Sequence, residues 1–345
     1  MKEKFLKMFQ ILREKVRTLF QKSAGSCKRL LSAVKEKAGA ALRLKQITAY
    51  LIFKWWSLAA GVLFVVLVLY YPVGAVIVHR IDVDPDFIGK SGTSVQTIAT
   101  MKALLRRETG AYMFTPNKPF FYPSAFLDDM PAFQEGIISG VKNTVEAFRQ
   151  INPLSESLKN AAERLAYPAD VWHVSNWKPA VSSVKKYKKA RTELGKYQKN
   201  VAEEKETFDR SAFALAAVIE RLEQEIENGA ETLWEHVSSS SGKMIDTSAD
   251  KVFYRVKGQA YVYFLALRDL KKDFGAAFEN EDFEREWINA LELLRKAVSP
   301  KPFFVINGDI DAPTLPNHLV AAGFRLSRAA ARLRNMLSDL RAEHE

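Results

Sequence analysis

The sequence predicts an all-α protein in which a single N-terminal transmembrane helix is followed by a multi-helix, bundle-like domain. Residues 55–78 form an apolar run without a charge, and apolar residues recur every three or four positions through most of residues 95–345. Sustained alternation with a period of two, which indicates strands, does not occur. We therefore expect a basic arm at 1–54, the span at 55–78, a linker at 79–94 and a helical domain at 95–345.

The apolar run has the length and the flanking residues of a membrane-spanning helix. As a helix its 24 residues would extend for about 36 Å, against a hydrocarbon core of about 30 Å. Trp55 and Trp56 at one end and Tyr70 and Tyr71 near the other match the aromatic belts of the two membrane interfaces. We therefore expect the lipid bilayer as a partner and these four residues as membrane anchors.

Charge on the two sides of the run predicts its orientation. Residues 1–54 hold fourteen Lys and Arg and three acidic residues, so the arm carries the whole net charge of +11. Residues 79–94 hold two basic residues and three aspartates. Positive charge stays in the cytoplasm, which predicts an uncleaved signal anchor with a cytoplasmic N-terminus and residues 79–345 outside. In a bacterium with two membranes, the outside is the periplasm. The single cysteine, Cys27, lies in the arm, so the outer domain suits an oxidising compartment.

The arm begins with an amphipathic pattern at residues 4–20. Its apolar positions are Phe5, Met8, Phe9, Leu12, Val16, Leu19 and Phe20. Lys and Arg fill much of the remaining surface, which is typical of a helix lying on anionic lipids. A docking helix for a cytoplasmic partner and a simple topology signal are the alternatives, whereas nucleic-acid binding is not expected because no aromatic platform accompanies the charge. A break at 23–26 and a weaker helix at 30–44 should follow.

Capping and periodicity signals place the helices of the outer domain. Helices are expected at 95–109, 131–150, 154–166, 179–205, 207–237, 250–278, 281–298 and 317–342. Thr93 or Ser94 should cap the first, Pro131 and Pro179 should open two others, and Asn317 should cap the last. The apolar stripe expected at 207–237 comprises Phe208, Phe213, Leu215, Val218, Ile219, Leu222, Ile226, Leu233 and Trp234. The one strand-like run is 303–306.

The linker contains alternating aspartates that resemble a calcium loop only in part. An EF-hand loop that begins at Asp82 and continues with Asp84 and Asp86 needs glycine at its sixth position and glutamate at its twelfth. Phe87 and Thr93 occupy these positions. No metal site is therefore expected here, and the aspartates are expected to be solvated.

Two segments between helices hold the candidate binding residues. Residues 110–133, the aromatic loop, contain seven aromatic residues and four prolines, so their rings must pack on the domain or on a partner. Residues 300–318, the polar loop, contain Asp309, Asp311 and His318, which could form an acid–base or metal cluster. The candidate binding residues are Tyr112, Phe120, Phe121, Tyr122, Asp128, Asp129, Asn307, Asn317 and His318. Helix capping is the structural alternative for Asp128, Asp129 and His318.

Sequence signatures of catalysis are not found. The chain has no Walker loop, no dinucleotide fingerprint, no GxSxG motif and no HExxH motif. Its histidines lack the spacing of metal ligands, and the serines at 238–241 suggest a flexible linker. We therefore expect no catalytic residues, no metal and no cofactor.

Short motifs in the outer domain resemble those of a bacterial envelope family. The matching pieces are Gly110, Ala111 and Tyr112; Leu127 to Pro131 with Gly136; Asp250 to Tyr254 with Gly258, Gln259 and Ala260; Ile306, Asn307 and Gly308; and Asn317 with His318. In this order they resemble domain-of-unknown-function family 2333. The resemblance implies a single-span inner-membrane protein and supplies no activity. The basic arm and the Asp309 to Asp311 insert depart from the pattern of that family.

Three functions are compatible with these features. The first is a non-enzymatic scaffold or adaptor whose outer domain binds an envelope protein or another envelope component. The second is an envelope-acting hydrolase with a cleft between the aromatic and polar loops, in which Glu108, Asp128 and Asp129 supply acids and His318 a base. The third is a periplasmic ligand sensor, for which an arm of 54 residues would need a cytoplasmic partner to transmit a signal.

Overall fold

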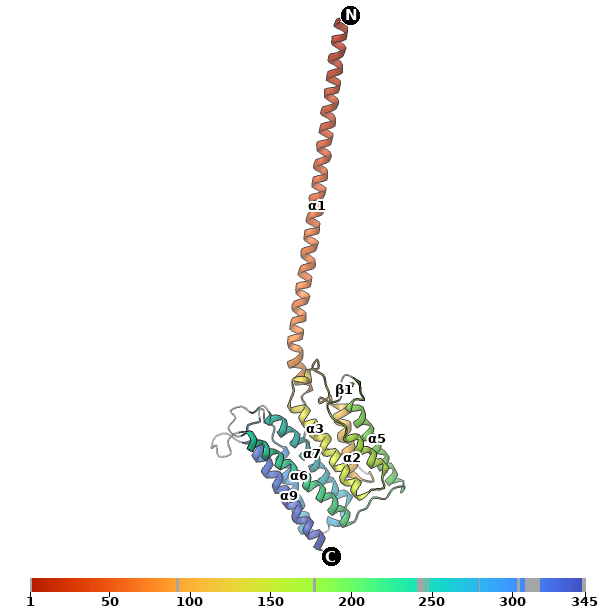
Figure 1. Ribbon diagram of the computed structural model, residues 1–345, viewed down its shortest axis with the longest axis vertical. Coiled ribbons are helices and arrows are strands. Elements are labelled where there is room, and N and C mark those ends of the chain that lie inside the picture. The colour runs from red at the N-terminus through yellow and green to blue at the C-terminus, as the bar shows by residue number, and fades with distance from the viewer. Residues whose placement is uncertain are drawn as a thin grey trace. The chain divides into compact units, whose positions relative to one another are not determined.

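A computed structural model confirms the all-α class (Figure 1). It describes residues 2–90, 93–175, 178–240, 246, 248–278, 280–302, 305–307 and 317–342. The chain divides into two compact units, Met1–Leu69 and Tyr70–Glu345, each of which is considered by itself. The polar-loop aspartates at 309 and 311 lie outside the described residues, as do 303 and 304, the first half of the expected strand-like run, whereas 305 and 306 are described and are not in a strand.

The first helix is continuous where the sequence suggested a break. Helix α1 runs through Lys2–Val78 without interruption, so the break expected at 23–26 is wrong. Ser and Gly cost only about 0.5–1 kcal/mol each in a helix, which long flanking runs of Ala, Lys and Leu offset. The helix also continues past Pro72. Every described side chain between Arg13 and Leu69 is exposed, and α1 is long and apolar enough to cross a membrane.

The second unit is a bundle built around two central helices. Its elements are α2 (Gln96–Arg106), η1 (Arg107–Ala111), η2 (Pro123–Phe126), α3 (Asp129–Ile151), α4 (Glu156–Leu165), β1 (Val174–Ser175), β2 (Lys178–Pro179), α5 (Ser183–Ala202), α6 (Ala212–Ser240), α7 (Ala249–Asp273), η3 (Gly275–Phe278), α8 (Glu281–Val298) and α9 (His318–Ala342). Helices α3 and α7 lie side by side, with α2, α4 and α5 packed to one side and α6, α8 and α9 to the other (Figure 1).

Two glycines let the central helices touch backbone to backbone. A Cβ atom at Gly258 of α7 would lie 2.3 Å from the carbonyl oxygen of Phe133 in α3. A Cβ atom at Gly136 of α3 would lie 2.1 Å from the carbonyl oxygen of Arg255 in α7. Real Cβ atoms do not approach a carbonyl so closely, because the overlap is strongly repulsive. Glycine is therefore required at both positions, and the crossing fixes how α3 and α7 pack.

The cap of α2 comes from a distant part of the chain. The sequence suggested Thr93 or Ser94, but neither side chain caps the helix. Instead, Asp273 at the end of α7 accepts hydrogen bonds from the backbone amides of Gln96 (2.6 Å) and Thr97 (2.8 Å). The aspartate satisfies two of the amides that a helix N-terminus leaves without partners, and it faces the positive end of the helix dipole.

Several helix boundaries differ from expectation for local reasons. Helix α5 begins at Ser183 rather than at Pro179, because residues 178 and 179 pair with 174 and 175 in a short antiparallel hairpin. Helix α6 begins at Ala212, since Ser211 Oγ accepts from the amide of Ala214 (3.1 Å) as an N-cap. By contrast, α8 has the expected bounds, and Asn317 caps α9 by accepting from the amide of Val320 (3.0 Å).

The stripe expected on α6 is correct in part. Leu215, Ile219 and Leu222 are buried, but Phe213 is 82% exposed and Trp234 is 55% exposed. Periodicity places both aromatic residues near the apolar face, yet no neighbouring helix covers them within the described part of the chain. They are therefore exposed apolar side chains, which the proposals below take up.

Replacing Gly258 by alanine should destabilise the bundle by about 3 kcal/mol or more, because the added methyl group overlaps the backbone of α3. The measurement is chemical unfolding of the full chain in detergent, followed by circular dichroism.

Gly195→Ala in α5 is the matched control. A Cβ atom there meets only the side chain of Lys102, at 3.7 Å or more. Alanine should therefore stabilise this helix by about 0.5–1 kcal/mol. Equal effects of the two substitutions would contradict the close crossing of α3 and α7.

Candidate functional site

The aromatic loop packs against the last turns of α1. Tyr70 Oη donates to the carbonyl of Phe121 (3.1 Å), and Tyr71 Oη donates to the carbonyl of Phe120 (3.4 Å). A Cβ atom at Gly74 would lie 2.4 Å from Pro123, so loop and helix are in direct contact. The loop therefore joins the two tyrosines predicted to be membrane anchors to the candidate binding rings.

The rings of the loop form one continuous group. The centroid of Phe121 lies 5.6 Å from that of Phe120, 5.2 Å from that of Tyr122 and 5.8 Å from that of Trp172, which precedes the β hairpin. Phe120 is 80% exposed and Phe121 is 45% exposed. The structure thus brings three of the predicted binding residues together and adds Trp172, which sequence reasoning missed.

Tyr112 belongs to a different group, centred on the buried pair Arg107 and Glu108. Arg107 Nε lies 2.7 Å from Glu108 Oε1, and the side chains are 6% and 0% exposed. Tyr112 Oη donates to Asp82 Oδ2 (3.0 Å), which also lies 3.5 Å from Arg107 Nη1. Burial and the hydrogen bond to Asp82 raise the pKa of Tyr112. Tyr261 Oη, which lies 3.5 Å from Arg107 Nη1, donates to the carbonyl of Asp84 (2.7 Å).

Glu108 is held on its other side by Gln134 of α3. Gln134 Nε2 donates to Glu108 Oε2 (2.9 Å), while its Oε1 accepts from both the amide and the hydroxyl of Thr115 (2.8 Å each). Arg107 and Glu108 lie in a π-helical turn, a feature frequent at functional sites. Here the described contacts tie the linker, the aromatic loop, α3 and α7 together, which supports a structural role. The sequence feature that could have indicated this buried pair is the adjacent Arg107 and Glu108 near the end of an apolar helix.

Asp128 is the N-cap residue of α3 and Asp129 is its first residue, but the side chain of Asp128 makes no capping hydrogen bond. Asp128 forms an ion pair with Lys251 (3.2 Å), and Asp129 lies 4.0 Å from His79. Burial, followed by repulsion from Asp250, raises the pKa of Asp129. The capping role expected for Asp128 is therefore wrong, because a lysine on α7 takes its carboxylate.

One face of α7 holds the start of the polar loop. Asp250 Oδ1 accepts from the amide of Val305 (3.0 Å), Tyr254 Oη donates to the carbonyl of Pro302 (3.1 Å), and Lys257 Nζ donates to the carbonyl of Pro300. These three residues recur at steps of four and three, so they share one face of the helix. Burial, with Lys301 nearby, lowers the pKa of Lys257 to about 8. Part of the motif Asp250 to Tyr254 thus holds a loop.

Asn307 lies at the centre of a second polar network. Its Nδ2 donates to Asp246 Oδ2 (2.9 Å) and to Ser240 Oγ (2.6 Å), and its Oδ1 accepts from Asn317 Nδ2 (3.0 Å). Asp246 Oδ2 also lies 2.8 Å from His236 Nε2. Burial alone would raise the pKa of Asp246, but hydrogen bonds from Asn307, Ser248 and His236 outweigh it and lower the pKa.

His318 is engaged by the backbone of the same segment. Its Nδ1 accepts from the amide of Ile306 (3.0 Å), and its own amide donates to the carbonyl of Ile306 (3.0 Å). The structure therefore brings Asn307, Asn317 and His318 together, as the sequence suggested. It places Glu108 in the separate Arg107 group and Asp128 against Lys251.

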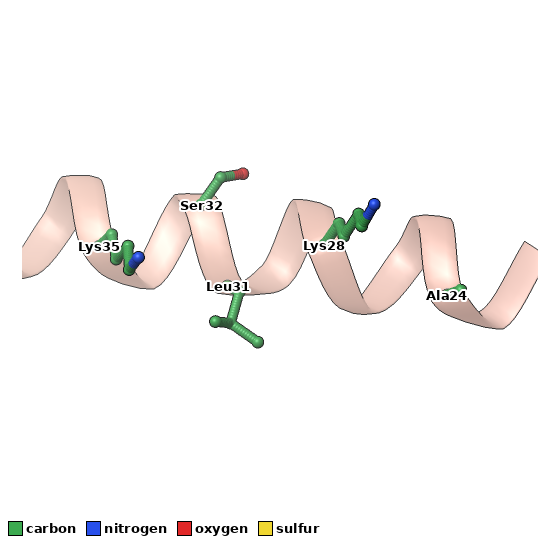
Figure 2. A pocket seen from close by; sticks show the side chains of 5 residues that line it. All are labelled: Ala24, Lys28, Leu31, Ser32 and Lys35. Atoms are coloured by element: carbon green, nitrogen blue, oxygen red, sulfur yellow. The ribbon is translucent and has the colours of Figure 1, made fainter.

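Neither hollow of the described surface suggests a ligand cavity. The larger is lined by Ala24, Lys28, Leu31, Ser32 and Lys35, all on α1. Figure 2 shows these side chains projecting from a single helix, and all five are exposed. The second lies between α8 and α9. Among the described residues, no group of three or more His, Cys, Asp or Glu side chains could hold a metal ion.

Replacing Asn307 by Asp should destabilise the domain in a pH-dependent way. The new carboxylate keeps the acceptor used by Asn317 but stands where Asn307 now lies 2.9 Å from Asp246. Like charges raise each other's pKa, so the pair would titrate in the folded protein above the unfolded value of about 3.9. The loss of stability relative to the native chain should be about 2 kcal/mol near pH 7 and should shrink as the pH falls towards about 5.

Asn307→Ala is the control for this charge effect. It removes the same hydrogen bonds without adding a charge, so the variant should be destabilised without the trend of Asn307→Asp. Unfolding of both variants and the native chain across this pH range provides the measurement. Parallel pH profiles for the two variants would refute the contact with Asp246.

The comparisons with known proteins give the family. The model of DUF2333, described as an uncharacterized protein conserved in bacteria, matches residues 41–249. The match covers more than half of the chain, so the chain belongs to this family and the resemblance of its motifs is confirmed. The motifs from Asp250 onward lie beyond the matched residues. No curated protein and no solved structure matches the chain.

Proposed function

We propose that this DUF2333 member is a single-pass inner-membrane scaffold whose periplasmic helical domain binds another protein of the bacterial envelope. Support for the anchor comes from α1, in which residues such as Phe64 (68% exposed) and Val66 (55% exposed) contact no other element. Each large apolar side chain gains about 1.5–3 kcal/mol on leaving water, which a lipid environment supplies. The basic arm before the span supports the orientation, and anionic lipids are its proposed partner.

The observation that carries the binding role is an exposed aromatic pair, Trp234 on α6 and Phe324 on α9. Their side chains are 55% and 62% exposed. A Cβ atom at Gly323 would lie 3.7 Å from Leu233, and Ser327 further along α9 bonds to Glu227 further back along α6 (3.2 Å). The helices therefore run antiparallel.

The antiparallel arrangement puts both rings on one side of the helix pair. Leu233 and Gly323 face each other across the pair. Each helix turns by about 100° per residue, and in two antiparallel helices the next residue on each therefore points to the same side of the pair. These next residues are Trp234 and Phe324. The guanidinium carbon of Arg328 lies 5.7 Å from the centroid of the Phe324 ring. Trp, Phe and Arg are enriched at the centres of protein interfaces, so this face suits a protein partner.

The candidate acid–base groups support binding more than hydrolysis. Glu108 is buried against Arg107, Asp128 pairs with Lys251, and the Nδ1 atom of His318 accepts a backbone hydrogen bond. A general base needs a nitrogen or oxygen directed at the substrate, and these atoms are already engaged. The scaffold is therefore the function that these contacts favour over the hydrolase.

Photo-crosslinking in intact bacteria tests the partner. A photoreactive residue at Ala321, which is exposed one turn before Phe324, should give one dominant protein adduct that mass spectrometry identifies. The adduct should disappear in the variant Trp234→Ala/Phe324→Ala, while stability changes by no more than about 0.5 kcal/mol because both side chains are exposed.

A probe at Lys188, exposed on α5 at the other side of the bundle, is the matched control. It should give no such adduct. The same adduct at both probes, or an adduct that survives the double substitution, would overturn the role of this face.

Reporter fusions test the orientation. An enzyme that is active only outside the cytoplasm should be active when fused after Glu345 and inactive when fused after Lys45 in the arm, because positive charge holds the arm inside. Activity in the reverse pattern would place the helical domain in the cytoplasm and overturn the periplasmic assignment.

A further inference from the structure

We propose that the exposed rings beside the end of α1 form a second membrane contact, which inserts into the outer interface of the bilayer. The surface consists of Phe120, Phe121 and Trp172 and is called the interfacial patch. Its occupant is the lipid headgroup and acyl boundary, so the inference rests on the proposed membrane anchor.

The depth of the patch follows from its contacts with the span. Tyr71 lies fifteen residues after Trp56, which is about 22 Å along a helix, and the hydrocarbon core is about 30 Å thick. This length is about 8 Å less than the core, so with the tryptophans at one interface Tyr70 and Tyr71 lie in the outer part of the core, at a depth of about 5–10 Å that interfacial apolar groups reach. Their hydroxyls donate to the carbonyls of Phe121 and Phe120, so the loop lies at the same depth as the tyrosine belt.

The composition of the patch suits this environment. Phe120 is 80% exposed and Phe121 is 45% exposed, and Phe121 links the loop to Trp172 with ring centroids 5.8 Å apart. Aromatic rings with an apolar body are enriched at the membrane–water boundary. In water the patch would expose apolar area, whereas at the interface lipid covers it.

The backbone of the loop also suits a region poor in water. Pro116, Pro119 and Pro123 have no amide hydrogen. The amide of Tyr122 donates to the carbonyl of Pro119 (3.0 Å), and the amide of Lys118 donates to the carbonyl of Thr115 (3.0 Å). The tyrosine hydroxyls satisfy the carbonyls of Phe120 and Phe121. Polar backbone groups that enter lipid need such partners, because water no longer supplies them.

A second contact would fix the domain relative to the membrane plane. A single helix leaves the outer domain able to rotate and tilt about the span, whereas a rigid patch beside the span restricts both motions. Within the second unit, Gly74 packs directly against Pro123, since a side chain at residue 74 would overlap the proline. The binding face of the scaffold would then be held at a defined height.

Fluorescence quenching by lipids tests the patch in the full chain. The single native cysteine is replaced (Cys27→Ser), and an environment-sensitive dye is attached in turn to Phe120→Cys, Phe213→Cys and Val66→Cys. The proteins are reconstituted in vesicles of phosphatidylethanolamine and phosphatidylglycerol that carry bromine either near the headgroup or deep in the acyl chains.

The dye at residue 120 should lose fluorescence with the shallow bromines, and its emission should shift to the blue relative to residue 213. Phe213 is the matched control, because it is also a phenylalanine and is 82% exposed, but lies at the start of α6. Phe208, five residues before Phe213, stacks on Phe148 near the C-terminal end of α3. Asp129, which follows the aromatic loop, lies at the other end of α3.

The dye at residue 66, in the middle of the span, separates the two proposals. If it is quenched by deep bromines while residue 120 behaves like residue 213, the anchor stands and the interfacial patch is refuted, which leaves these rings to a protein partner. If residue 66 is not quenched, the anchor fails and the patch fails with it. Since Phe120 is exposed, labelling there leaves the fold intact, which an unchanged circular dichroism melting curve would verify.

Discussion

The close crossing of α3 and α7 is the constraint on which the bundle depends. Gly136 and Gly258 bring two backbones into contact, and Gly140, whose added Cβ would lie 2.8 Å from Val262, extends the crossing by one turn. Because protein interiors are closely packed, the short separation between α3 and α7 constrains where the other helices can pack. Helices α2, α4 and α5 cover one side of the pair, and α6, α8 and α9 cover the other.

Buried charges connect the irregular segments to this core. Arg107 and Glu108 join the linker and the aromatic loop to α3 through Gln134, and Asp273 joins the end of α7 to the start of α2. Removing one partner of such a pair leaves an uncompensated buried charge, which is strongly destabilising. The polar residues that a search for catalysis would select are thus largely those that hold loops in place, and Asn307 with Asp246 follows the same pattern.

Two of the exposed aromatic groups of the second unit carry the proposals. Trp234 and Phe324 flank the antiparallel contact of α6 and α9, while Phe120 and Phe121 lie beside the final turns of α1. The first suits a protein surface and the second suits a lipid interface, because only the second is fixed to the end of the apolar run. Under the two proposals, the second unit would contact the membrane at one place and bind a protein partner at the other.

The sequence by itself determined the all-α class, the apolar run and most helices, because hydrophobic periodicity, caps and length are local signals. It also grouped Asn307, Asn317 and His318, which are close along the chain. Only the tertiary structure decided that Asp273 caps α2, that Asp128 pairs with Lys251 and that Tyr70 bonds to the aromatic loop. These contacts join residues that are distant in the sequence, and which ones meet is fixed by helix packing rather than by any local pattern.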